Sequence, residues 1–130
     1  MIEFLSDEWI AALAGAAPAS GGDGERIVVE PVVQGVPGRD EVRYRIAFYE
    51  VGCVVADVGA DAPPADVCLE TDYSTAVALA RGALNAQAAL ADGRLRVSGN
   101  VARLAAHAAA LTRLGDLFAA VRPATTYPGA

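Results

Sequence analysis

The side chains that could carry out chemistry are few and lie far apart in this sequence. Cys53 and Cys68 are the only cysteines, and they lack the C-x-x-C spacing of a metal or redox site. His107 is the only histidine, and its place beside an apolar helical stripe is typical of a half-buried structural imidazole. The sequence contains no G-x-S-x-G, H-E-x-x-H or Walker motif. We therefore predict no catalytic residue, no metal ligand and no cofactor, and a protein that is not an enzyme.

The charge of the chain excludes another class of protein. A net charge of −6 argues against a nucleic-acid partner, because phosphate binding needs a cluster of positive charge. Most of the arginines follow residue 80, whereas the acidic residues concentrate before it. These opposite charges either pair across the fold or leave Arg81, Arg103 or Arg113 for transient contact with an anionic membrane surface.

The length and hydropathy pattern of the chain indicate a single domain over residues 1–130. No apolar run approaches the roughly 18 residues that cross a bilayer. The first residues also lack the pattern of a secretory signal. We therefore expect a soluble, cytoplasmic protein.

The elements that position these side chains begin with a short amphipathic helix. Ser6 is a suitable N-cap, and Trp9 and Leu13 recur on the apolar side of the helix that follows it. Pro18 and the glycines after it end the pattern.

Between residues 26 and 72 the hydrophobic period changes to two, which predicts four successive strands. In the clearest one, over 41–50, apolar and polar residues alternate so that one face belongs to the core. The core face of that strand consists of Val42, Tyr44, Ile46 and Phe48. Pro31 lies inside the first strand, about 26–35, and has no N–H for a ladder, so this strand is expected to bulge there or to leave the position unpaired.

The C-terminal half of the chain returns to helical periodicity with one more strand. Asp72 or Thr71 caps a helix, which Gly82 closes in the left-handed conformation. The expected elements after it are a second helix over 83–92, a fifth strand over 94–98 and one long helix from Asn100 to Pro123. This order predicts an α+β fold, a five-stranded and mainly antiparallel sheet with helices packed on one face.

Alanines are frequent in the predicted helical layer. A small side chain that faces a sheet either lets the two layers pack closely or leaves a volume between them. The alanines concerned are Ala86, Ala88, Ala89, Ala105, Ala108 and Ala109. Both interpretations stay open at this point.

The stretch over residues 72–100 resembles the sterol carrier protein type 2 family. It begins D-Y-S-T and continues as G-x4-Q-x5-G-R-L-x-V-x-G-N from Gly82 to Asn100. The family pattern has a strand that ends in an acidic turn, then a helix, a glycine, an amphipathic helix and G-(K/R)-L-x-(V/I)-x-G-(D/N) before a closing helix. The opening residues 4–9 and the ending near Tyr127 are also similar to short stand-alone bacterial members.

The resemblance implies an apolar cavity between the sheet and the helices that holds a sterol, a fatty acid, a fatty acyl chain or a similar lipid without covalent chemistry. It implies ligand contacts from apolar positions on the elements that enclose the cavity. We predict these contacts for Trp9, Leu13, Val42, Tyr44, Ile46, Phe48, Leu69, Val77, Leu84, Gln87, Ala88, Leu104, Ala108, Leu111 and Phe118. Gln87 is the one polar residue of the set, either a partner for a ligand headgroup or water, or an exposed glutamine.

Two other functions stay open. The same fold could serve as a self-association or scaffold module, with a homodimer and no physiological ligand. The protein could also be an enzyme whose cofactor leaves no trace in the sequence.

Overall fold

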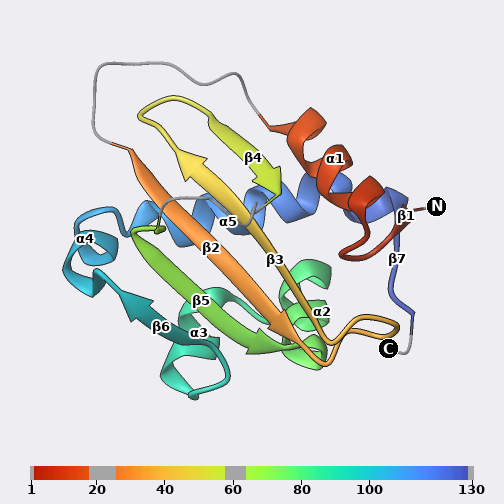
Figure 1. The fold of residues 1–130 in the computed structure, drawn as a ribbon. Coiled ribbons are helices and arrows are strands. Elements are labelled where there is room, and N and C mark those ends of the chain that lie inside the picture. Colours follow the sequence, from red (N-terminus) through yellow and green to blue (C-terminus); the bar gives the residue numbers. More distant parts are fainter. Residues whose placement is uncertain (1, 18–25, 58–63, 129–130) are drawn as a thin grey trace.

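The fold is built around a five-stranded sheet, seen in a computed structural model that describes residues 2–17, 26–57 and 64–128. The strand order is β4-β3-β2-β5-β6, with β2 in the centre (Figure 1). Neighbouring strands run antiparallel except β2 and β5, which are parallel. The sheet is therefore mixed, and mainly antiparallel as predicted. The strands are β2 (Ile27–Gln34), β3 (Glu41–Phe48), β4 (Cys53–Asp57), β5 (Val67–Asp72) and β6 (Arg96–Gly99).

Pro31 interrupts the ladder between β2 and β3 without shifting its register. Val29 pairs with Ile46 and Val32 pairs with Arg43, so the same register holds on both sides of Pro31. This register places Pro31 opposite Tyr44, where proline has no N–H to donate. The unpaired alternative of the prediction is confirmed, and no residue is bulged out.

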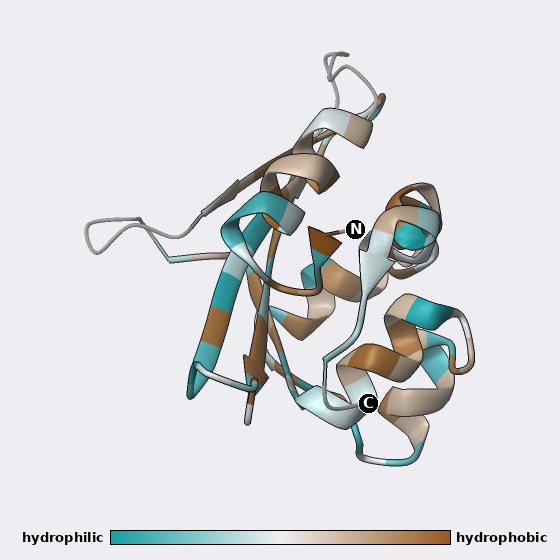
Figure 2. Ribbon diagram, turned by 90° about the vertical axis from the view of Figure 1, so that its right-hand side faces the viewer, coloured by the Kyte–Doolittle hydropathy of each residue, from teal (hydrophilic) through white to brown (hydrophobic). Residues whose placement is uncertain are grey.

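Helices cover one face of the sheet. In Figure 1, α2, α3 and α5 lie behind the strands, while α1 lies beside the β4 end of the sheet. Figure 2 shows the sheet and the helical layer side by side, with hydrophobic and hydrophilic residues alternating along the strands. The helices are α1 (Asp7–Ala16), α2 (Tyr73–Arg81), α3 (Ala86–Ala91), α4 (Val101–Ala106) and α5 (Ala109–Val121). None of the helices in the described residues is long and apolar enough to cross a membrane.

The predicted helix caps are confirmed. The side chain of Ser6 accepts a hydrogen bond from the Trp9 N–H at 3.2 Å, and that of Asp72 accepts one from the Thr75 N–H at 2.8 Å. Gly82 closes α2 with φ 78°, in the left-handed region that glycine tolerates. These helix ends depend on hydrogen bonds between residues that are close in the sequence, so the sequence alone indicates them.

Two helical boundaries differ from the prediction. The helix α3 begins at Ala86 and not at residue 83, because the Oδ1 of its N-cap, Asn85, accepts from the Ala88 N–H at 2.7 Å. The expected long helix is broken at His107, where φ −119° and ψ 46° leave the helical region. Alanines surround the break, and their high helix propensity gives no local sign of an interruption.

The two ends of the described chain meet in a small parallel sheet that the sequence pattern did not predict. Strand β1 (Ile2–Glu3) pairs with β7 (Thr125–Thr126), which follows a 3-10 turn η1 (Arg122–Ala124). The Tyr73 hydroxyl donates to the Pro128 carbonyl at 2.7 Å. Strands of two residues carry too little pattern to be seen in a sequence.

The face of the sheet opposite the helices carries a network of charges. The Glu30 carboxylate is 6% exposed and lies 3.0 Å from the Arg45 guanidinium and 3.5 Å from that of Arg43. The Cys68 thiol lies 3.6 Å from the same carboxylate. Burial and, next, the Glu30 charge raise the pKa of Cys68. This thiol therefore stays protonated and poorly reactive.

Candidate functional site

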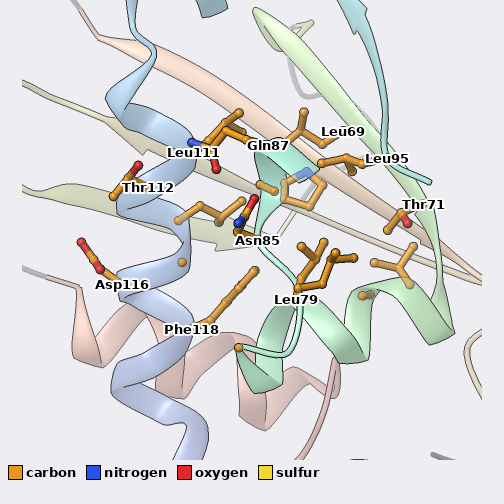
Figure 3. Close-up of a pocket in the computed structure, with 18 of the residues that line it drawn as sticks. Leu69, Thr71, Leu79, Asn85, Gln87, Leu95, Leu111, Thr112, Asp116 and Phe118 are labelled. Atoms are coloured by element: carbon orange, nitrogen blue, oxygen red, sulfur yellow. The ribbon is translucent and has the colours of Figure 1, made fainter. Parts of the chain in front are cut away.

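A pocket of about 260 Å³ lies between the covered face of the sheet and the helices α2, α3 and α5 (Figure 3). Its floor, the side made by the strands, consists of alternate residues of β2, β3 and β5, because alternate side chains point to the same face. The floor residues are Pro31, Val33, Tyr44, Leu69 and Thr71. All of them are buried.

The walls of the pocket come from the helices and the segments next to them. Small residues of α2 and α3 and large apolar residues of α5 face the floor. The wall residues are Phe4, Ala76, Leu79, Leu84, Ala86, Leu95, Leu111, Leu114 and Phe118. An enclosure of this composition excludes water and favours an apolar guest.

Polar side chains surround the opening of the pocket between α3 and α5. Asn85 and Gln87 come from the α3 side, and Thr112 and Asp116 come from α5 (Figure 3). All four are exposed. Arg122 is half-buried at the same opening, and its Nε donates to the Ala80 carbonyl at 2.8 Å. The pocket thus has an apolar interior and a polar rim.

Tyr44 is the aromatic residue of the pocket floor. It is 2% exposed, and its ring meets the Trp9 ring edge-on with 5.6 Å between centroids. The Trp9 ring also packs against the rings of Phe4 and Phe118, with 4.9 Å and 5.9 Å between centroids. Both phenylalanines line the pocket. Burial raises the pKa of Tyr44 well above its ordinary value. Its hydroxyl is therefore a neutral hydrogen-bonding group at every physiological pH.

The structure brings only part of the predicted site together at this pocket. The predicted residues in its lining are Tyr44, Leu69, Leu84, Gln87, Leu111 and Phe118. The predicted residues buried in the core outside the lining are Trp9, Leu13, Val42, Ile46, Phe48, Val77 and Leu104. Phe48 lines a second hollow of about 240 Å³ between α1, β4 and α5. Contact of any of these residues with a ligand stays a prediction.

The alanine-rich layer differs most from the expectation. Ala108 is exposed, so it does not face the sheet, and the same holds for Ala105 and Ala109. Ala88 is half-buried outside the lining, and Ala89 is fully buried in the core. Because an alanine buries little apolar area, a helix gains little by turning it toward the core. Ala86 is the member of the predicted group that lines the pocket.

The pocket lining also contains residues outside the predicted set. Pro31 and Val33 lie on the core face of β2, and Leu95, just before β6, is buried. Periodicity identifies such a face, but it does not say where the helices leave it uncovered. Asp116 and Arg122 carried no signal beyond a charge at the edge of a helical stripe.

Two of the three arginines considered for membrane contact are held within the fold. Arg113 donates to the carbonyls of Tyr49 at 2.7 Å and Gly52 at 2.6 Å. The Arg103 Nε lies 3.5 Å from the Asp66 carboxylate. Arg81 is exposed and stacks over the Tyr127 ring at 5.5 Å. Of these three arginines, Arg103 is the one that pairs with an acidic side chain across the fold.

The described lining contains little that could perform a reaction. Asp116 is its only carboxylate, and it lies at the exposed rim. The Thr71 hydroxyl is engaged as a donor to the Arg94 carbonyl at 2.8 Å. No group of three or more His, Cys, Asp or Glu residues in the described ranges is placed to hold a metal ion. The arrangement is suited to enclosing an apolar molecule.

The fold and this site define a class, a small α+β domain with an apolar pocket between its sheet and its helices. The model of the SCP-2 sterol transfer family matches residues 31–112, from the pocket floor into α5. The chain belongs to this family. No curated protein sequence matches it.

Solved structures share the fold over nearly the whole chain. A crystal structure of sterol carrier protein 2 has a TM-score of 0.64 and 19% identity, covering 92% of this chain and 97% of that one. A conserved hypothetical protein from Thermus thermophilus, described as possibly a sterol carrier protein, has a TM-score of 0.62 and 20% identity, covering 99% and 94%. A palmitated sterol carrier protein 2-like 2 from Aedes aegypti has a TM-score of 0.53 and 18% identity, covering 85% and 88%. At these identities the likeness concerns the fold alone.

Proposed function

We propose that this protein binds and carries a hydrophobic ligand, a sterol, a fatty acid, a fatty acyl chain or a similar lipid, without covalent chemistry. The observation that carries this proposal is the pocket of about 260 Å³, with a buried apolar interior and a polar rim. Each methylene group buried there contributes about 0.8 kcal/mol, so a chain of eight gains about 6 kcal/mol before the cost of immobilising it.

The size of the pocket favours a single chain or one end of a larger molecule. Its volume of about 260 Å³ is just below the range of about 300–1,000 Å³ typical of small-molecule sites. A ligand with a charged end would place that end at the rim, within reach of the Asn85 and Gln87 amides. The family description and the palmitated relative from Aedes aegypti support a ligand of this kind.

Gly115 offers a way to block the pocket without disturbing the fold. It lies in α5 at the rim, and a Cβ added there has no atom within 4 Å. Gly115→Leu fills the opening, and we expect it to weaken binding of a fluorescent fatty acid about tenfold, or about 1.4 kcal/mol, because the leucine side chain occupies space that the ligand needs. Displacement titrations with wild-type protein and variant measure the change.

Gly15→Leu is the matched control for this experiment. Gly15 also lies within a helix, α1, with open space at its Cβ, and it is outside the pocket lining. Both substitutions replace a helical glycine, so both favour their helix, but only one enters the pocket. Unchanged binding in Gly115→Leu, or wild-type protein that binds no fatty acid and purifies without an apolar molecule in native mass spectra, contradicts the proposal.

Self-association is the second candidate function, and one observation favours it. Val54 on the edge strand β4 is 46% exposed, and β4 pairs only with β3 within the described residues. An edge strand with an exposed apolar side chain can add a strand from a second copy. Light scattering decides the point, because a strict monomer at high concentration removes this function.

A further inference from the structure

The buried end of the pocket carries one polar group with an unusual environment, the Tyr44 hydroxyl. The side chain lies on the floor, opposite Pro31 in the register, and lines the pocket at 2% exposure. Its ring is held by the edge contact with Trp9, with an interplanar angle of 82°. The position of the hydroxyl is therefore fixed by packing.

Within the described ranges the structure gives the Tyr44 side chain a ring contact with Trp9 and no hydrogen bond. The buried polar atoms that lack a partner in these ranges do not include its hydroxyl, so the hydroxyl is accessible from the pocket that Tyr44 lines. Phenylalanine would supply the same ring without a polar group at this position. Thr71, the other hydroxyl of the floor, already donates to the Arg94 carbonyl. Tyr44 is thus left with both a donor and an acceptor function at the inner end of an apolar pocket.

The charges around the pocket limit what this hydroxyl can meet. Within the described lining, the charged groups of Asp116 and Arg122 belong to the rim, and no cation lies on the floor. An ionised carboxylate next to Tyr44 would lose its hydration without gaining a counter-ion, which is strongly unfavourable. A carbonyl or hydroxyl oxygen loses much less on burial and gains a hydrogen bond.

We propose that Tyr44 selects the ligand, which enters with an uncharged oxygen atom at its inner end and accepts a hydrogen bond from the tyrosine hydroxyl. This inference rests on the proposed function and specifies it, since it selects ketones, alcohols and esters of apolar molecules over plain hydrocarbons. A fatty acid would bind in the opposite direction, with its carboxylate at the rim.

The test compares Tyr44→Phe with the wild-type protein for two ligands of equal length, 2-undecanone and undecane, each delivered from cyclodextrin. Displacement of a fluorescent fatty acid gives the affinities. Trp9 is the only tryptophan and touches Tyr44, so its fluorescence reports occupancy independently. We expect Tyr44→Phe to lower the affinity for 2-undecanone about fivefold, the effect of one lost hydrogen bond, and to leave the affinity for undecane unchanged.

Tyr49→Phe serves as the control, because the Tyr49 hydroxyl accepts from the Arg26 guanidinium at 3.2 Å outside the pocket lining. If Tyr44→Phe and the wild type bind 2-undecanone with equal affinity, the inference is wrong. It is also wrong if Tyr44→Phe loses the same affinity for both ligands, because Tyr44 would then have only a packing role. Wild-type protein that binds neither ligand contradicts the proposed function itself, and this outcome is distinct from the other two.

Discussion

At the scale of single residues, Asp72 joins the sheet to the helical layer. It is the last residue of β5 and the N-cap of α2, and its carboxylate accepts from the Thr75 N–H at 2.8 Å. This hydrogen bond is the main reason that the pKa of Asp72 is lowered in the folded protein. The ionised form of this residue therefore stabilises the start of α2, which forms one wall of the pocket.

Asp72→Ala removes the cap, and we expect it to lower the free energy of unfolding by about 1 kcal/mol at neutral pH. Because the folded pKa lies below the unfolded one, this contribution is complete above about pH 4 and is lost as pH falls through the folded pKa. The destabilisation should therefore shrink toward about pH 3 in urea unfolding series.

Asn100→Ala is the neutral counterpart of that experiment. Asn100 caps α4 through its amide oxygen, which accepts from the Arg103 N–H at 3.0 Å and does not titrate. The loss in the free energy of unfolding that Asn100→Ala causes should stay constant over the same pH range. A cost of Asp72→Ala that does not change with pH would assign the effect to helix propensity alone.

Caps are also the residues that a sequence predicts best, because donor and acceptor are within three positions of each other. Ser6, Gly82 and Asn100 mark helix ends in the sequence, and Asp72 is one of two candidates there, of which the structure selects it over Thr71. The sequence leaves Gln87 as either an exposed residue or a ligand partner, and the structure places it exposed at the pocket rim.

At the scale of elements, one side chain ties α5 to the turn between β3 and β4. Arg113 donates to the carbonyls of Tyr49 and Gly52, and its guanidinium lies 5.0 Å from the Phe48 ring centroid. The planar fork of arginine serves two carbonyls at once, which a lysine ammonium on a flexible stem does not reproduce.

Arg113→Lys should therefore lower the free energy of unfolding by about 1–3 kcal/mol, the range for hydrogen bonds to charged groups. Chemical denaturation measures the change. Arg39→Lys alters an exposed pair with Asp7 at 3.6 Å and should change stability by less than about 1 kcal/mol. Equal small effects in the two variants would contradict a structural role for the arginine fork.

The kinds and order of the elements were predictable, because each carries its own period of apolar residues. The break at His107 was not, since no proline or glycine marks it and the helix on either side is rich in alanine. The predicted start of this helix at residue 83 is too early, because Asn85 caps α3.

At the scale of the whole molecule, the pairing of β1 with β7 closes the fold around the pocket. Phe4 follows β1 and lines the pocket. Its ring packs against the Tyr127 ring with 5.2 Å between centroids, and its N–H donates to the Thr126 carbonyl at 2.9 Å. Segments at opposite ends of the described chain thus hold one wall residue in place. A sequence cannot show such a long-range contact through a local pattern.

Removal of residues 125–130 should destabilise the protein by at least about 2 kcal/mol, because it deletes several hydrogen bonds and an aromatic contact. The binding of the fluorescent fatty acid should weaken as well, since Phe4 loses its support. Tyr73→Phe removes only the hydrogen bond to the Pro128 carbonyl and should cost about 1 kcal/mol. A truncated protein as stable as the full chain would show that β7 is dispensable.

The pocket itself is a property of the whole molecule. The core face of each strand was predictable, but the uncovered part of that face depends on the crossing of α5 and on the short link before α3. For this reason Trp9, Ile46 and Val42 pack in the core while Pro31 and Val33 border the pocket.

Pro31 leaves the ladder between β2 and β3 one donor short, while its pairing with Leu69 of β5 continues. Widening a sheet across its strands stretches the ladder hydrogen bonds, and at this point proline has no N–H to supply one. This point lies opposite Tyr44, on the floor of the pocket. A guest that fills the pocket therefore presses on a part of the sheet where one ladder hydrogen bond is missing.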